Sequence, residues 1–135
     1  MYTVTKEIRF CYGHRLLGHQ GQCRHLHGHS ARALITLASE ELDALGMVCD
    51  FSTIKEEIGQ WIDATLDHTL LLYARDPLIP LLQQAGERFL SVDANPTAEF
   101  IAKMIFDYGR SRGLPVRDVR IYESDSSFAG YGASA

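Results

Sequence analysis

The 135-residue chain lacks several features that would assign a protein to a class outright. It has only three cysteines, an odd number that does not indicate a disulfide framework, so we expect reduced thiols and a cytoplasmic protein. No apolar run approaches the roughly 20 residues of a membrane-spanning helix. The opening segment, MYTVTKEIRF, also lacks the apolar core of a signal peptide. We therefore expect no membrane association.

The chain also lacks an excess of positive charge. Thirteen Lys and Arg residues stand against seventeen Asp and Glu residues, a net charge of −4 with neutral histidine. Non-specific binding to DNA or RNA needs a basic surface, so we expect no nucleic-acid partner. No linker, low-complexity tract or clear internal repeat interrupts the sequence, and its length suits one domain. We expect residues 1–135 to form a single domain.

What the chain does have is an uneven distribution of histidine. Five of its six histidines fall within a window of sixteen residues, and a cysteine lies among them. The cluster consists of His14, His19, Cys23, His25, His27 and His29. Composition alone therefore indicates a functional site in this segment.

The order of the expected elements predicts an α+β fold. Alternating apolar residues predict strands, and apolar residues spaced three or four apart predict helices. The expected strands are Tyr2–Phe10, His27–Leu37, Met47–Cys49, Phe89–Val92 and Val116–Tyr122, with the tail 126–133 adding another. The expected helices are Asp50–Leu66, Pro77–Ala85 and one that starts at 95–97 and ends at Gly113. Because the helices come in a block between strands, we expect an antiparallel sheet with helices on one face.

His27 and His29 predict a metal site. Residues i and i+2 of a strand share a face, and these two share the parity of Ala31, Ile35 and other apolar residues, so they point inward. Buried imidazoles without partners are costly, and a divalent ion bound to both removes that cost. Zinc needs three or four ligands, mostly nitrogen or sulfur. His14, which directly follows the first strand, is the best third candidate, whereas His19 and His25 are better explained as loop residues.

Cys23 permits three interpretations. It is a fourth ligand that closes a structural zinc site, a reactive thiolate beside an open coordination position, or an inert residue. A zinc ion and neighbouring basic side chains would lower the pKa of the thiol and favour the thiolate. The sequence spacing alone does not decide whether Cys23 is a metal ligand or a catalytic residue.

Two further candidates lie outside the histidine cluster. Asp67 and His68 are adjacent at the end of an expected helix, and a carboxylate that bonds an imidazole fixes its tautomer and raises its basicity. The alternative is a helix-end acid with a surface histidine. Glu123 ends an apolar strand and is either solvated or an anchor for a guanidine-like edge, which a carboxylate binds through two parallel hydrogen bonds.

Four separated segments together resemble the signatures of the 6-pyruvoyl-tetrahydropterin synthase superfamily. They are FCYGHRL, CRHLHGHS, LDHTLL with NPTAE, and IYESDSSFAGY, and they span Phe10 to Tyr131. The resemblance implies the tunnelling fold, an antiparallel four-stranded sheet with two main helices. It also implies a homo-oligomer in which trimeric barrels pair as hexamers.

The resemblance assigns roles to individual residues. It implies zinc ligands at His14, His27 and His29, catalytic residues at Cys23, Asp67 and His68, and pterin-binding residues at Glu123 and, less directly, Thr97. Three residues separate Cys23 from His27, as in the bacterial branch of 6-carboxy-5,6,7,8-tetrahydropterin synthases of queuosine biosynthesis. Tyr12-Gly13 is a departure, because many members have small residues there.

The implied activity is that of a zinc-dependent lyase. The family substrate is 7,8-dihydroneopterin triphosphate, and the carboxy branch converts it to 6-carboxy-5,6,7,8-tetrahydropterin with release of acetaldehyde and triphosphate. Two alternatives stay open: 6-pyruvoyl-tetrahydropterin synthase activity on the same scaffold, and a non-catalytic pterin-binding or structural zinc module in which Cys23 closes the metal site. Zinc with three protein ligands would indicate catalysis, and zinc with four a structural role.

Overall fold

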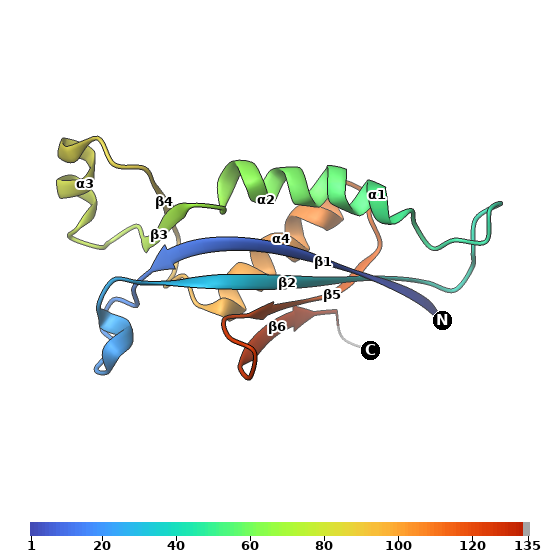
Figure 1. The fold of residues 1–135 in the computed structure, drawn as a ribbon, viewed down its shortest axis with the longest axis horizontal. Helices are drawn as coiled ribbons and strands as arrows, with labels where there is room; N and C mark the ends of the chain where they lie inside the picture. Colours follow the sequence, from blue (N-terminus) through green and yellow to red (C-terminus); the bar gives the residue numbers. More distant parts are fainter. Residues whose placement is uncertain (134–135) are drawn as a thin grey trace.

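The computed structural model describes residues 1–133 (Figure 1). Its strands are β1 (Tyr2–His14), β2 (His27–Ser39), β3 (Thr69–Tyr73), β4 (Phe89–Val92), β5 (Val116–Tyr122) and β6 (Phe128–Gly132). Its helical segments are η1 (Gln22–Arg24), α1 (Phe51–Ile54), η2 (Lys55–Gly59), α2 (Gln60–Thr65), α3 (Ile79–Ala85) and α4 (Ala98–Ser111). The segment from α1 to α2 is continuous, with η2 as a π-helical turn, and with α4 it forms the two main helices.

One sheet organises these elements, in the strand order β4-β3-β1-β2-β5-β6. The predicted four-stranded antiparallel sheet is present as β1-β2-β5-β6, in which each strand pairs antiparallel with the next. The sheet has six strands rather than four, since β3 and β4 extend it through parallel pairs beside the end of β1. The expected strand Met47–Cys49 is wrong, as this segment is irregular.

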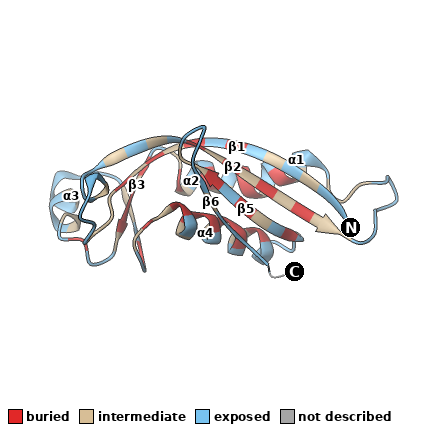
Figure 2. Ribbon diagram, turned by 90° about the horizontal axis from the view of Figure 1, so that it is seen from below, coloured by how far each residue is buried: buried red, intermediate tan, exposed pale blue. Residues whose placement is uncertain are grey.

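The core lies between one face of the sheet and the two main helices. Buried and exposed residues alternate along β1 and β2, as the sequence predicts, and Figure 2 shows this alternation along β2. The isoleucines spaced four apart in the first main helix are fully buried against the sheet. That helix begins where the Asp50 side chain accepts a hydrogen bond of 2.8 Å from the Ser52 N–H. Burial of this apolar stripe therefore fixes which face of the sheet the helices cover.

Helix α4 approaches the sheet unusually closely. Its start is capped by Thr97, whose hydroxyl accepts from the Phe100 N–H at 3.1 Å, and Gly113 follows its end with φ +80°. A Cβ at Gly109 would lie 2.7 Å from Val116, so glycine is required where helix and strand meet. This close contact fixes the distance between the last turn of α4 and the start of β5.

The sheet thus has two different faces. We call the helix-covered side the covered face; along β1 it carries Ile8, Phe10, Tyr12 and His14. We call the other side the open face; in β1 it carries residues of the opposite parity, including Cys11. The functional candidates divide between these faces.

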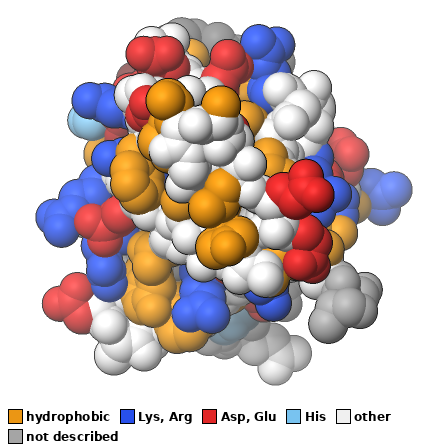
Figure 3. All heavy atoms as spheres, turned by 90° about the vertical axis from the view of Figure 1, so that its right-hand side faces the viewer, with side chains coloured by type: hydrophobic (Ala, Val, Ile, Leu, Met, Phe, Trp, Pro, Cys, Tyr) orange, Lys and Arg blue, Asp and Glu red, His pale blue; other side chains and the backbone are white. Residues whose placement is uncertain are grey.

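The β2–α1 loop forms one end of the molecule. Leu45 is exposed there, and the view onto this end in Figure 3 shows hydrophobic side chains among interspersed acidic and basic ones. None of the described helices is both long and apolar enough to cross a bilayer.

Candidate metal centre and its surroundings

The covered face brings His14, His27 and His29 together. One ring nitrogen from each lies within 4.8 Å of the others, and His14 Nε2 is 3.2 Å from His29 Nε2. His14 is directly opposite His27 in the β1–β2 register, and His29 follows two residues along the same face. The parity argument is therefore correct about which way the pair points, and the hairpin supplies the third histidine.

Hydrogen bonds to backbone carbonyls fix two of these rings. His14 Nδ1 donates to the Pro96 oxygen at 2.6 Å, and His27 Nδ1 donates to the His25 oxygen at 2.7 Å. A carbonyl only accepts, so the proton resides on Nδ1 and the Nε2 lone pair remains available. Burial lowers the pKa of His14 by more than the bond to Pro96 raises it, so this ring is neutral at pH 7. Three converging imidazoles, two of them held in this way, fit a divalent metal ion.

Glu123 borders the histidines from the end of β5. Its Oε2 lies 3.0 Å from His29 Nε2 and 3.5 Å from His14 Nε2, and it accepts a hydrogen bond of 2.8 Å from the Tyr12 hydroxyl. Burial, reinforced by the charge of Glu123, raises the pKa of Tyr12. Sequence reasoning identified Glu123 but missed the contact with Tyr12, because 111 residues separate the two.

Cys23 lies in the short η1 segment and shares a pocket with the histidines. The pocket has a volume of about 480 Å³ and is lined by His14, Leu16, Gln22, Cys23, His27, His29, Thr97, Ala98, Glu99 and Glu123. The three converging ligand atoms are all imidazole nitrogens. The Thr97 hydroxyl lines this pocket while it caps α4. Six of the eight residues predicted for the site thus surround one cavity.

The other two, Asp67 and His68, form a cluster with Cys11 on the open face. Asp67 Oδ1 accepts from the Cys11 N–H at 2.9 Å, and His68 Nδ1 bonds Asp67 Oδ2 at 2.8 Å. The His68 N–H donates to the Cys11 oxygen at 2.7 Å, and its φ of +56° is the only positive value at a non-glycine among residues 1–133. Burial raises the pKa of Asp67, but the bonds from Cys11 and His68 outweigh it and hold the pKa below its usual value.

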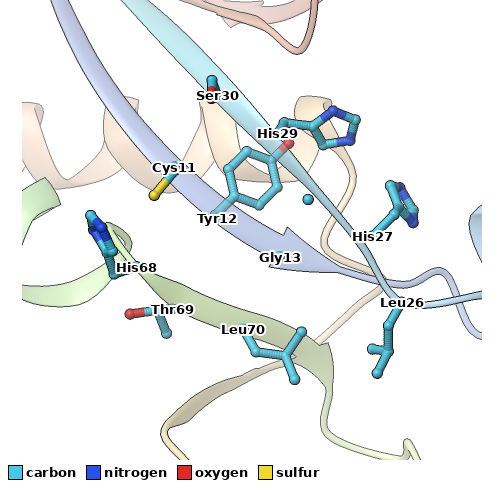
Figure 4. A pocket seen from close by; sticks show the side chains of 11 residues that line it. Cys11, Tyr12, Gly13, Leu26, His27, His29, Ser30, His68, Thr69 and Leu70 are labelled. Atoms are coloured by element: carbon cyan, nitrogen blue, oxygen red, sulfur yellow. The ribbon is translucent and has the colours of Figure 1, made fainter.

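The predicted catalytic residues therefore do not meet within one chain. Cys23 and His68 share none of the pockets described within residues 1–133: Cys23 lines the pocket of about 480 Å³, whereas His68 lines a cavity of about 810 Å³ with Cys11 and Arg32. His68 also lines an open pocket with His27 and His29 (Figure 4). Figure 4 shows the Tyr12 ring directed toward His29 and the Cys11 sulfur directed toward His68. The His68 side chain is 76% exposed, so its outer nitrogen is accessible to another molecule.

A buried ion pair braces the chain just after His14. Arg15 donates through Nε to Asp76 Oδ2 at 2.7 Å, and a second bond from Arg15 reaches Oδ1. The Asp76 carboxylate is fully buried and also accepts from the Leu78 N–H. The hydrogen bond from Arg15, against the effect of burial, holds the pKa of Asp76 below its usual value. Arg15 therefore has a structural role, as the partner of a buried carboxylate.

Comparison with known proteins identifies the family. The family model for 6-pyruvoyl tetrahydropterin synthase matches residues 3–134. The chain belongs to this family. A relative from Rickettsia bellii named 6-carboxy-5,6,7,8-tetrahydropterin synthase is 35% identical over 135 residues, covering 95% of this chain and 98% of the relative. A relative of the same name from Haemophilus influenzae is 29% identical over 139 residues, covering 97% and 99%.

Solved structures share the fold. An uncharacterized protein from Wolinella succinogenes has a TM-score of 0.87 and 29% identity, covering 98% of both chains. The 6-pyruvoyl tetrahydropterin synthase of Caenorhabditis elegans has a TM-score of 0.72 at 22% identity, covering 98% and 96%. The predicted α+β tunnelling fold and the predicted family of synthases are confirmed.

Proposed function

We propose that the chain converts 7,8-dihydroneopterin triphosphate to 6-carboxy-5,6,7,8-tetrahydropterin, acetaldehyde and triphosphate. Atom balance requires that one water is also consumed. The observation that carries the proposal is the convergence of three histidine nitrogens beside Cys23 and Glu123 in one pocket. Relatives named for the 6-carboxy product support this branch of the family.

The proposed metal is zinc, held by His14, His27 and His29. Three nitrogen ligands, two of them with hydrogen-bonded Nδ1 positions, are typical of a zinc site that keeps a fourth position open. When bound there, zinc supplies Lewis-acid chemistry that acidifies a C–H beside a coordinated side-chain oxygen of the substrate. The backbone bonds of His14 and His27 orient their rings before the metal arrives.

Within the pocket, Glu123 holds the pterin and Cys23 moves protons. The Glu123 carboxylate accepts from the N–H groups of the amino-pyrimidine edge, a paired contact that a guanidine-like group makes well. Thr97 lies at the rim of the same pocket and is a second candidate for contact with the pterin. Cys23 Sγ accepts or donates a proton at the side-chain carbons of the substrate.

His68 supplies a second proton-transfer group, and we propose that it comes from another copy of the chain. Asp67 occupies Nδ1 of His68, so Nε2 is the nitrogen that exchanges protons. His68 and Cys23 line different cavities of one chain, which a site shared between chains would reconcile.

The edges of the central sheet support such an assembly. Along β1 only Tyr12–His14 pair with β3, which leaves the outer edge of residues 2–11 without a partner strand in the described chain. Strand β6 has β5 on one side only and exposes Phe128. Open edges of this length need covering. We propose that β1 and β6 of different copies pair into trimeric barrels, two of which form a homohexamer.

We propose that the reaction belongs to queuosine biosynthesis in the cytoplasm. The proposed partner is a small pterin triphosphate, with no nucleic acid or membrane. The decisive experiment is incubation of zinc-loaded protein with 7,8-dihydroneopterin triphosphate and mass analysis of the products. Acetaldehyde with 6-carboxytetrahydropterin supports the proposal. A 6-pyruvoyl product without acetaldehyde indicates the other branch. No turnover, together with four protein ligands on zinc, indicates a structural module.

A further inference from the structure

Tyr12 has an unusual position between the proposed pterin anchor and the histidine cluster. Its side chain is 3% exposed, and its ring centroid lies 5.0 Å from that of His14 and 5.6 Å from that of His29. Its hydroxyl donates to Glu123 Oε2, the oxygen that also lies near both histidine nitrogens. One carboxylate oxygen therefore has neighbours on two sides, the histidines and Tyr12.

Binding of an ion changes only one of these two sides. Once His14 and His29 present their Nε2 lone pairs to a metal, those nitrogens cannot donate to Glu123. The Tyr12 hydroxyl is not a ligand and keeps its bond. Of the described contacts to Glu123 Oε2, the one from Tyr12 is therefore the hydrogen bond that survives metal binding.

The spacing around Oε2 shows what Glu123 could do without that bond. Ligand atoms around a tetrahedral zinc ion with bonds near 2.0 Å lie about 3.3 Å from one another. Oε2 already lies 3.5 Å from His14 Nε2 and 3.0 Å from His29 Nε2. Oε2 thus lies at ligand spacing from both nitrogens while it accepts from Tyr12, so an ion there would compete with the Tyr12 hydroxyl for this oxygen.

We infer that Tyr12 is a positioning residue: its hydroxyl holds Glu123 as an acceptor for the substrate and competes with the metal for that carboxylate oxygen. The inference rests on the proposed function, because it presumes that Glu123 binds a pterin. Tyr12 acts through Glu123 and does not itself touch the reacting atoms.

A double-mutant cycle tests the inference through binding rather than turnover. The variants are Tyr12→Phe, Glu123→Gln and the double variant, and the probe is neopterin, an unreactive pterin followed by its fluorescence. Tyr12→Phe keeps the ring and should weaken neopterin binding about tenfold, the scale of one hydrogen bond to a charged group. The double variant should bind no more weakly than Glu123→Gln. The matched control is Tyr108→Phe, which should bind neopterin as the wild type does. The Tyr108 ring stacks on Trp61 between the helices, with 4.4 Å between the ring centroids.

A second readout follows the metal itself. In cobalt(II)-loaded protein, the visible spectrum of Tyr12→Phe should change as Glu123 enters the coordination sphere, and adding Glu123→Gln should restore the wild-type spectrum. Circular dichroism and metal content establish that each variant is folded and loaded. If Tyr12→Phe does not fold, Tyr12→Met replaces it, because methionine adapts to irregular apolar space.

The outcomes separate this inference from the proposed function. Wild-type protein that does not bind neopterin overturns the proposed function and the inference with it. Wild-type affinity and spectrum in Tyr12→Phe overturn the inference alone. Full additivity of the two substitutions also overturns it, because Tyr12 would then act independently of Glu123.

Discussion

The two sides of the β1–β2 hairpin carry two contrasting clusters. On the covered face, His14, His27 and His29 converge within one chain, and His14 is buried at 3% exposure. On the open face, Asp67 and His68 are fixed to Cys11, but the His68 side chain is 76% exposed. The first cluster has its partners inside the fold, whereas the second presents a fixed nitrogen to solvent. One chain therefore brings together the three predicted metal ligands but leaves the predicted catalytic pair Asp67–His68 apart from Cys23.

The largest effect that this comparison predicts is on metal content. His27→Ala and His29→Ala should each lose bound zinc. Mutating a group that only contacts a metal ligand lowers metal affinity about 10- to 100-fold, and removing a ligand itself should lower it further. Metal analysis of purified protein measures this. His19→Ala, in the exposed loop, should retain one zinc per chain and serves as the control. Full zinc retention in His14→Ala would remove His14 from the ligand set.

The next effect separates the two clusters by turnover. Cys23→Ala and His68→Ala should each retain zinc while the rate falls by about 10²–10⁴, the usual contribution of a positioned acid or base. Cys49→Ala should keep full activity, since burial raises the pKa of that thiol and it lies outside both clusters. Steady-state rates and zinc content of the same preparations give both results.

Mixing these two inactive variants sharpens the test. If sites are shared between chains, co-assembly of Cys23→Ala with His68→Ala should restore activity at about a quarter of the sites, because random partners then combine both intact residues. Co-expressed and unmixed proteins are assayed side by side. Continued inactivity of a mixed oligomer, or a stable active monomer on sedimentation, would contradict the shared site.

A smaller effect is expected on substrate recognition. Glu123→Gln keeps the shape but removes the charge and replaces an acceptor with a donor, so pterin affinity should fall by about 2–3 kcal/mol. Calorimetric titration with a pterin measures it, and zinc content should not change. An unchanged affinity would mean that Glu123 is only a solvated strand end.

The smallest effect concerns the brace behind the covered cluster. Arg15 holds the pKa of Asp76 below its ordinary value of 3.8 in the folded protein. The ion pair therefore stabilises the fold at neutral pH, and this stabilisation is lost as the pH falls below 3.8 and Asp76 becomes protonated. Asp76→Asn should therefore lower the free energy of unfolding by about 1.5–3 kcal/mol at pH 7 and by less near pH 3. Asp107→Asn, which breaks the exposed pair with Lys103, should cost under about 0.5 kcal/mol. Equal losses in urea titrations would contradict the difference.

Periodicity predicted most of the fold, and its failures have physical causes. Strand β5 lies where alternation predicts it, and the main helices follow their apolar spacing. Strand β3 was not predicted, because Leu71 and Leu72 are both buried and such a run does not alternate. The structure is irregular over Met47–Cys49, where three apolar residues suggested a strand.

Parity along β2 predicted two members of the covered cluster, and the pairing of β1 with β2 suggested the third. His27 and His29 needed only the period of two, and His14 needed only the assumption that β1 pairs with β2. The open cluster depends on the parallel pairing of β1 with β3, which brings Asp67 to Cys11 across 56 residues. Local patterns contain no signal for such a contact. The roles of Cys23, Asp67, His68, Glu123 and Thr97 came from the family resemblance and stay predictions.

The direct pairing of His14 with His27 has a mechanical consequence. These two residues are the last pair of the β1–β2 hairpin, and the loop between them carries Cys23. Both ends of this loop start at the His14–His27 pair. An ion bound by both rings would hold the two ends of the loop together, so its removal should make the whole loop more mobile. Proteases should then cut the metal-free protein first between residues 15 and 26. The Cys23 thiol would become disordered before the sheet unfolds.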